Sequence, residues 1–191
     1  MSRLKLFALG TCALCLVTAI GCDELLGLLC PCPSRDNLEL MNQAEQIVHA
    51  QYPSFTLIEA WGTPSSGSAT VAAEIDEWRF IFVATIEDEP STVTLDYANC
   101  RFDSPEFVSD FWIGTVYERL PREVSLDQAI EALRATGCSD AFTGVTIRRA
   151  LIMPEPPEAC YAFSIPCQFF LVGAETGEVL SEDFPEAGGF D

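Results

Sequence analysis

Two amphipathic helical segments, each followed by a run of strand-forming segments, constrain the fold of this chain most strongly. In the first, residues 37–52, apolar residues recur at helical spacing. Either Asp36 or Asn37 can cap its start, and Pro53 ends it, because proline lacks the amide hydrogen that a helix interior needs. This pattern predicts a helix that covers a sheet with its apolar face.

The second helical segment, residues 121–137, carries its own start and stop signals. Ser125 is the expected N-cap, and Gln128 three residues later completes a capping box. Gly137 ends the helix, because glycine tolerates the left-handed backbone that often follows a helix. A helix followed by antiparallel strands, twice in one chain, predicts an α+β fold with each helix packed on an antiparallel sheet.

Strand-forming segments, rich in β-branched and aromatic residues and separated by turn residues, follow each helix. After the first helix we expect strands at residues 55–61, 69–75, 77–86 and 91–97. One face of the third strand carries Trp78, Phe80, Phe82 and Ala84. After the second helix we expect strands at residues 142–153, at residues 159–174 with an interruption at Pro166, and in a short segment ending at Leu180.

A connecting segment, residues 102–123, separates the two helix-and-strand runs. Ser104 and Pro105 are typical of a helix start, and apolar residues follow at helical spacing up to Val116. The same stretch is rich in β-branched residues, so a strand at residues 111–117 stays open.

The two runs also resemble each other weakly in sequence. Aligning RFIFVATIEDE with QFFLVGAETGE matches Phe80 with Phe169 and Val83 with Val172, which indicates two similar halves. We therefore divide the chain into a signal peptide at residues 1–21, a tether with a CPC motif at 22–37, a first half at 38–101, the connecting segment at 102–123 and a second half at 124–191.

The N-terminus has the pattern of an export signal. Residues 1–5 are basic, and residues 6–21 are uncharged over a length short of the roughly 20 residues that span a bilayer. Gly21 precedes Cys22 where the apolar run ends. Here the chain resembles the signals of bacterial lipoproteins, in which a small residue precedes a lipidated cysteine. It departs from them at Ala19, where those signals usually have leucine.

This resemblance implies that Cys22 is the first residue of the mature protein and carries acyl chains such as palmitate. More than one acyl chain anchors a protein stably, so the body would lie in the periplasm or outside the cell, attached to an inner or outer membrane. An ordinary signal peptide cleaved nearby, or an uncleaved anchor, is the alternative. Cys30 is a poorer lipidation candidate, because it lies beyond the first acidic residues.

The composition is strongly acidic, with a formal net charge of −19. Nucleic acid is an unfavourable partner, because no basic patch is present to displace the counterions of the phosphates. The same charge would repel anionic headgroups, so we expect membrane contact only through lipid at Cys22. A basic protein partner fits this charge, and so does a solvated acidic surface without a partner.

The cysteines divide according to this interpretation. Of nine, two leave with the signal peptide and Cys22 takes lipid, which leaves an even number for disulfides in an exported protein. The six disulfide candidates are Cys30, Cys32, Cys100, Cys138, Cys160 and Cys167. Among the possible pairings, one joins Cys160 to Cys167 and joins Cys100 and Cys138 to the CPC cysteines. The mature chain lacks CxxC pairs and histidine knuckles, so neither a zinc site nor a redox site is expected.

The second half carries a family resemblance. VSLDQAIEALRATG, followed by strands that end in VGAETGEVL, resembles a PepSY-type domain over about residues 124–180. The resemblance implies a β-lactamase-inhibitor-like architecture and a binding or inhibitory role in the cell envelope, often on peptidases. The first half is similar only in its order of elements. The PEPPE stretch at residues 154–158 and Pro166 depart from the family pattern.

No catalytic motif accompanies this architecture. The single histidine, His49, lies inside the first helical segment, and neither GxSxG, HExxH nor a glycine-rich phosphate loop occurs. The acidic turn at residues 87–89 is expected to be a solvated hairpin tip. We therefore expect no enzymatic activity, no cofactor and no metal.

The expected function is binding or inhibition of another envelope protein, with peptidases among the candidates. Trp112 and Tyr117 of the connecting segment are candidates for an exposed partner-binding patch. A structural or assembly scaffold of the envelope is the alternative function, and an acid-dependent hydrolase is less favoured.

Overall fold

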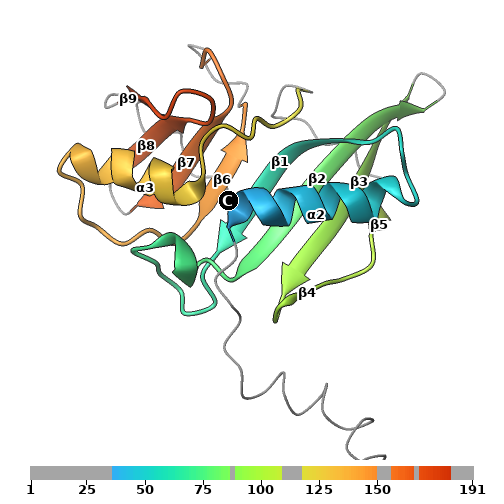
Figure 1. Ribbon diagram of the computed structural model, residues 1–191, viewed down its shortest axis with the longest axis horizontal. Coiled ribbons are helices and arrows are strands. Elements are labelled where there is room, and N and C mark those ends of the chain that lie inside the picture. The colour runs from blue at the N-terminus through green and yellow to red at the C-terminus, as the bar shows by residue number, and fades with distance from the viewer. Residues whose placement is uncertain (1–35, 87–88, 109–117, 150–155, 166–167, 182–191) are drawn as a thin grey trace, which may run out of the picture. The chain divides into compact units, whose positions relative to one another are not determined.

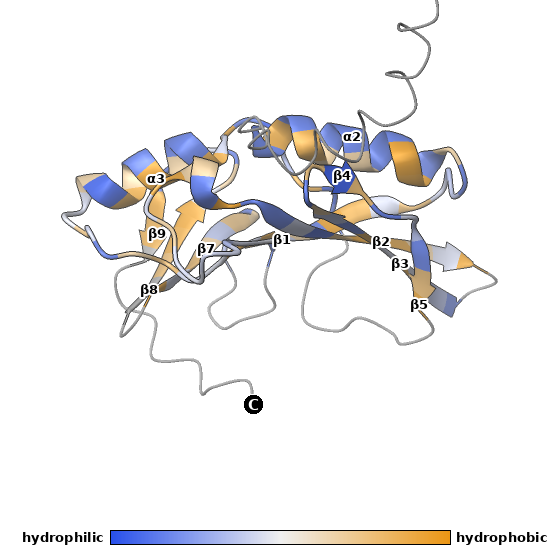
Figure 2. Ribbon diagram, turned by 90° about the horizontal axis from the view of Figure 1, so that it is seen from below, coloured by the Kyte–Doolittle hydropathy of each residue, from blue (hydrophilic) through white to orange (hydrophobic). Residues whose placement is uncertain are grey.

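The computed structural model describes residues 36–86, 89–108, 118–149, 156–165 and 168–181. These residues form one antiparallel sheet with two α-helices on the same face (Figure 1). The side view in Figure 2 shows both helices on one side of the strands. The predicted α+β class with an antiparallel sheet is therefore confirmed. Within the described part of the chain, no helix is long and apolar enough to span a membrane.

The helices are α2 (Asn37–His49) and α3 (Leu126–Ala135), with a short 3-10 helix η1 (Ala72–Glu74). The strands are β1 (Thr56–Thr63), β2 (Glu77–Ile86), β3 (Glu89–Ala98), β4 (Arg101–Phe102), β5 (Glu106–Val108), β6 (Val145–Arg148), β7 (Cys160–Ile165), β8 (Gln168–Gly173) and β9 (Val179–Ser181). Their order in the sheet is β4-β3-β2-β1-β6-β7-β8-β9, and β5 also pairs with β3. Antiparallel pairing of β1 with β6 makes the strands that follow α2 and those that follow α3 one continuous sheet.

Both helices begin and end as their sequences predict. Asp36 caps α2, because its Oδ1 accepts a hydrogen bond of 3.1 Å from the amide of Leu38. At α3, Ser125 and Gln128 form the predicted capping box, with hydrogen bonds of 3.3 and 2.8 Å between each side chain and the other residue's amide. Gly137 follows α3 with φ +92°, the left-handed conformation that favours glycine.

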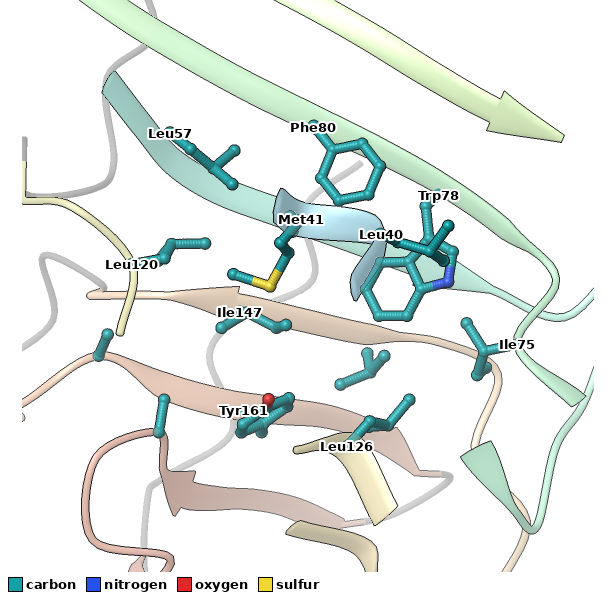
Figure 3. Packing of buried hydrophobic residues seen from close by; sticks show 14 of the residues in the cluster. Leu40, Met41, Leu57, Ile75, Trp78, Phe80, Leu120, Leu126, Ile147 and Tyr161 are labelled. Carbon is teal, nitrogen blue, oxygen red and sulfur yellow. The ribbon is translucent and has the colours of Figure 1, made fainter. Parts of the chain in front are cut away.

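The core lies between the helices and the sheet face that they cover (Figure 3). The predicted apolar face of β2 is buried there: Trp78, Phe80, Phe82 and Ala84. Figure 3 shows Met41 of α2 lying over β1, with Ile147 of β6 and Tyr161 of β7 in the same layer. Burying one side chain of this size stabilises the folded state by about 1.5–3 kcal/mol. One shared core therefore lies beneath both helices.

Two predicted elements are wrong. The strand expected at residues 69–75 is a single bridge at Ala69 followed by η1. The reason is local, because the Glu74 carboxylate accepts hydrogen bonds from the amides of Thr70 and Val71 and closes a turn that competes with a strand. The helix expected after Ser104 is also wrong at its start.

The segment after Ser104 forms strand β5 and not a helix. β5 pairs with β3 from Thr94↔Glu106 to Thr92↔Val108. An aromatic and a β-branched residue, Phe107 and Val108, suit such a strand, and the pairing satisfies backbone groups of β3 at the edge of the sheet. Residues 109–117 lie outside the described residues, and so does the alternative of a strand at residues 111–117.

The strand order also corrects the sequence alignment of the two runs. Residues 159–174 form two strands, β7 and β8, which pair as a hairpin from Cys160↔Gly173 to Ile165↔Gln168. Phe80 lies in β2, the second strand after α2, whereas Phe169 lies in β8, the third strand after α3. The aligned residues therefore occupy different places in the order of strands.

Two connections tie the parts of the sheet together. The β1–β2 loop reaches α3, where Arg134 Nη2 donates to the carbonyl oxygen of Thr70 at 3.1 Å. The segment before α3, residues 118–125, likewise reaches α2 and β1. The amide of Leu120 donates to the carbonyl oxygen of Leu57, and Arg122 forms an ion pair of 3.2 Å with Glu45 of α2. Each helix is thus held by a connection from the other part of the chain.

Candidate binding site

A pocket of about 210 Å³ lies where the two helices begin. We call it the helix-start pocket, and its lining residues are Asp36, Asn37, Ala72, Ile75, Trp78, Leu126 and Asp127. Figure 1 shows α2 and α3 pointing away from this meeting point. Ile75, Trp78 and Leu126 are buried apolar residues, whereas Asp36 and Asp127 are exposed. The accessible lining of the pocket is therefore mainly polar, with an acidic rim and a small apolar floor.

The rim is negative even after the helix dipoles are counted. Each helix start carries a partial charge of about +0.5, and two ionised carboxylates contribute −2, which leaves a net charge of about −1. Among the described residues, neither Asp36 nor Asp127 forms an ion pair. The pocket therefore offers uncompensated negative charge to a ligand.

A buried hydrogen-bond network fixes the pocket wall. Asn37 Nδ2 donates to the hydroxyl of Tyr161 at 2.9 Å, and Asn37 Oδ1 accepts from the amide of Leu126 at 2.7 Å. The Tyr161 hydroxyl donates in turn to the carbonyl oxygen of Val124 at 2.6 Å. Burial raises the pKa of Tyr161, so its hydroxyl keeps the proton that this bond needs. One residue of α2 thereby holds the first turn of α3 in place.

The opposite face of the sheet carries a second polar group, centred on Glu59. A β-bulge between Leu57 and Glu59 directs this carboxylate to the face away from the helices, where it is fully buried. Trp61 Nε1 donates to Glu59 Oε1 at 2.5 Å, and Arg148 Nη1 lies 3.4 Å from the same oxygen. Because solvent does not reach Glu59, we interpret this group as structural.

A third polar group is centred on the buried carboxylate of Glu158, which holds the turn between β8 and β9. Its Oε2 accepts from the amides of Glu175 and Thr176 at 2.6 and 3.1 Å, and its Oε1 accepts from the Thr176 hydroxyl at 2.5 Å. A Cβ at Gly173 would collide with Glu158, which explains the glycine. The PEPPE stretch, residues 154–158, was predicted to depart from the PepSY-type pattern. Its last residue, however, supports the acidic turn on which the resemblance partly rests.

Of the described cysteines, Cys100 agrees with the predicted disulfide set, whereas Cys138 and Cys160 do not. Cys100 is disulfide-bonded, and with Asn99 it forms a two-residue turn of positive φ between β3 and β4. Cys138 is a half-buried free thiol, and Cys160 is a buried one whose pKa burial raises to about 12. The predicted bridges through Cys138 and Cys160 are therefore absent from the structure.

Cys160 begins β7, and about 16 Å of extended chain separates it from Ile165 at the end of that strand. Cys138, the other free thiol, packs against the core as a small apolar residue. The remaining predicted site residues lie outside the described residues: Cys22, Cys30, Cys32, Cys167, Trp112 and Tyr117.

His49, the single histidine of the chain, makes a contact within the fold. His49 Nε2 lies 2.7 Å from the carbonyl oxygen of Phe55 and donates to it, which links the end of α2 to the approach of β1. Within the described ranges, no group of three or more histidine, cysteine, aspartate or glutamate side chains is placed to hold a metal ion.

Sequence reasoning assigned Asp36 to a helix cap and Trp78 to the core, and it did not single out Asp127. Acidic residues at both helix starts were visible in the sequence. Their convergence was not visible, because it depends on the pairing of β1 with β6.

No protein-family model, curated protein sequence or solved structure matches this chain. The geometry and charge of the helix-start pocket therefore carry the proposed function.

Proposed function

We propose that this chain is a non-catalytic, lipid-anchored protein of the bacterial cell envelope that binds another envelope protein, with peptidases among the candidate partners. The observation that carries the proposal is the helix-start pocket. Its small apolar floor offers a contact for a side chain, its acidic rim selects charge, and the Asn37 network holds its wall before a partner arrives. These properties suit recognition.

The proposed anchor is lipid at Cys22, supported by the position of this cysteine at the end of an uncharged run. Its test is the intact mass of the protein extracted from native membranes, measured with and without reductant. We expect a chain that starts at Cys22 and carries acyl chains. A chain that starts elsewhere without lipid would contradict the anchor.

We also propose that the fold consists of two similar PepSY-like units. What supports this is the order of elements, since α2 and α3 are each followed by three strands that pair consecutively, and the two series meet at the antiparallel β1–β6 pair. Superposition of α2-β1-β2-β3 on α3-β6-β7-β8 tests the repeat, and we expect the same strand order and the same direction of each helix across its strands. Helices that cross their strands in unrelated directions would contradict a repeat.

The proposed binding is tested with membranes from the native organism. The wild-type protein and the double variant Asp36→Asn/Asp127→Asn are used as baits, and we expect an envelope protein that the wild type retains and the variant loses. Recovery of an outer-membrane complex equally by both baits would favour the scaffold alternative. Robust turnover of purified protein in a panel of hydrolase assays would contradict a non-catalytic role.

A further inference from the structure

We propose that the helix-start pocket takes the cationic side chain of an arginine or lysine from the partner protein. The methylene stem would lie against Ile75 and Trp78, and the charged head would lie between Asp36 and Asp127. This inference rests on the proposed function and deepens it, because it names the chemistry of the contact.

The charge of the rim selects a cation. The net charge of about −1 at the pocket matches one positive group and repels carboxylates and phosphates. Among the described residues, no basic side chain lines the pocket, and the formal net charge of the whole chain is −19. The negative electrostatic field of the chain therefore attracts cations at long range, and the pocket accepts cations at short range.

A small apolar floor beneath a mainly polar lining suits a long, amphipathic side chain. Arginine and lysine bury their methylene stems along apolar surface and keep their heads at a polar boundary. The volume of about 210 Å³ is small for a folded element of a partner but has room for one long side chain. Trp78 adds an aromatic ring to the lining, and tryptophan is the aromatic residue that attracts cations most strongly.

The pocket is also organised in advance of binding. Asn37 connects the two helix starts, and the Ser125–Gln128 capping box fixes the first turn of α3, from which Asp127 projects. Asp36 is held by its own bond to the amide of Leu38. Binding therefore orders few groups of this protein, which reduces the entropic cost of the complex.

The experiment uses a small probe on the purified protein. N-acetyl-arginine amide is titrated at low salt, and the backbone amides of Leu126 and Asp127 and the indole N–H of Trp78 are followed by NMR. We expect saturable shifts at these positions and an affinity that falls as salt rises. N-acetyl-citrulline amide, the uncharged isostere of the arginine probe, should bind at least about tenfold more weakly. Equal binding of the two probes, or no saturable shift with the arginine probe, would overturn the proposal.

Variants locate the site. Asp127→Asn and Asp36→Asn should each weaken the arginine probe by about threefold to tenfold. Asparagine caps a helix as well as aspartate does, so Asp36→Asn should leave α2 intact. The control is Glu131→Gln, which removes an exposed charge from α3 outside the pocket and should leave affinity unchanged. A control that loses as much affinity as Asp127→Asn would show binding to the general acidic surface and overturn the assignment.

A fourth variant tests occupancy without changing charge. Ala72→Leu adds volume to the lining, and we expect it to weaken the arginine probe while circular dichroism stays that of the wild type. Unchanged affinity in folded Ala72→Leu protein would place the probe outside the pocket.

The probe needs neither membrane nor partner, so its failure is distinguishable from that of the proposed function. Absence of probe binding, together with a partner retained from membranes, overturns this inference alone. Probe binding without any envelope partner supports the pocket chemistry and overturns the proposed function.

Discussion

Asn37 of α2 and Tyr161 of β7 lie 124 residues apart and form a buried hydrogen bond of 2.9 Å. Through Asn37 the same network reaches Leu126, the first residue of α3. A single amide side chain thus connects both helix starts to the sheet beneath them. The shape of the helix-start pocket depends on this connection.

Tyr161→Phe should lower the free energy of unfolding by about 1–3 kcal/mol, because it leaves Asn37 Nδ2 and the carbonyl oxygen of Val124 without this buried partner. Urea denaturation followed by circular dichroism measures the change. Tyr52→Phe is the matched control, since Tyr52 contacts the ring of Phe55 and its hydroxyl has no described hydrogen bond. Equal losses in the two variants would contradict the role of the network.

Alkaline pH should destabilise the protein through Cys160. Burial raises the pKa of this thiol from 9.0 to about 12, so the folded state holds the proton more tightly than the unfolded state does. The contribution is complete below pH 9 and is lost as pH rises from 9 towards 12. The free energy of unfolding should therefore fall more steeply from pH 9 to 11 in the wild type than in Cys160→Ala. Parallel pH profiles would contradict a buried, protonated thiol.

The two free thiols should react at different rates. Burial raises the pKa of Cys160 to about 12, so its thiol stays protonated at pH 8, and the side chain is also shielded from the reagent. Iodoacetamide should therefore label half-buried Cys138 first and Cys160 only after denaturation, as read by peptide mass spectrometry. If neither thiol is labelled after denaturation without reductant, both cysteines are in disulfides, as the sequence predicted, and the free thiols are contradicted.

Glu45→Gln should destabilise the protein by about 1–3 kcal/mol, because it leaves the guanidinium of Arg122 largely buried without its counter-charge. The control is Asp96→Asn, which breaks the Arg79–Asp96 pair on the surface, where the side chains are 52% and 39% exposed. Exposed pairs contribute about 0–1 kcal/mol. Urea titrations compare the two, and a smaller loss in Glu45→Gln would contradict the importance of the Arg122 connection.

Local signals in the sequence predicted local structure well. The capping box of Ser125 and Gln128 and the alternation in β2 involve residues close in the chain, and the structure confirms both. Features that depend on distant partners were missed. Glu106–Val108 became a strand because β3 lies beside it, and Asp36 meets Asp127 only because β1 pairs with β6. The pocket is therefore a product of topology, which periodicity and capping signals do not encode.

The central claim, that an envelope protein docks at the helix-start pocket, is tested most directly by photo-crosslinking in native cells. A photoreactive phenylalanine analogue replaces Val71, which is 48% exposed beside Ala72 of the pocket lining. In a second strain it replaces Ile86, which is 42% exposed at the end of β2. We predict a crosslinked envelope protein from position 71 that is missing from position 86 and is lost with Asp36→Asn/Asp127→Asn. The same products from both positions, unaffected by the double variant, would contradict the claim.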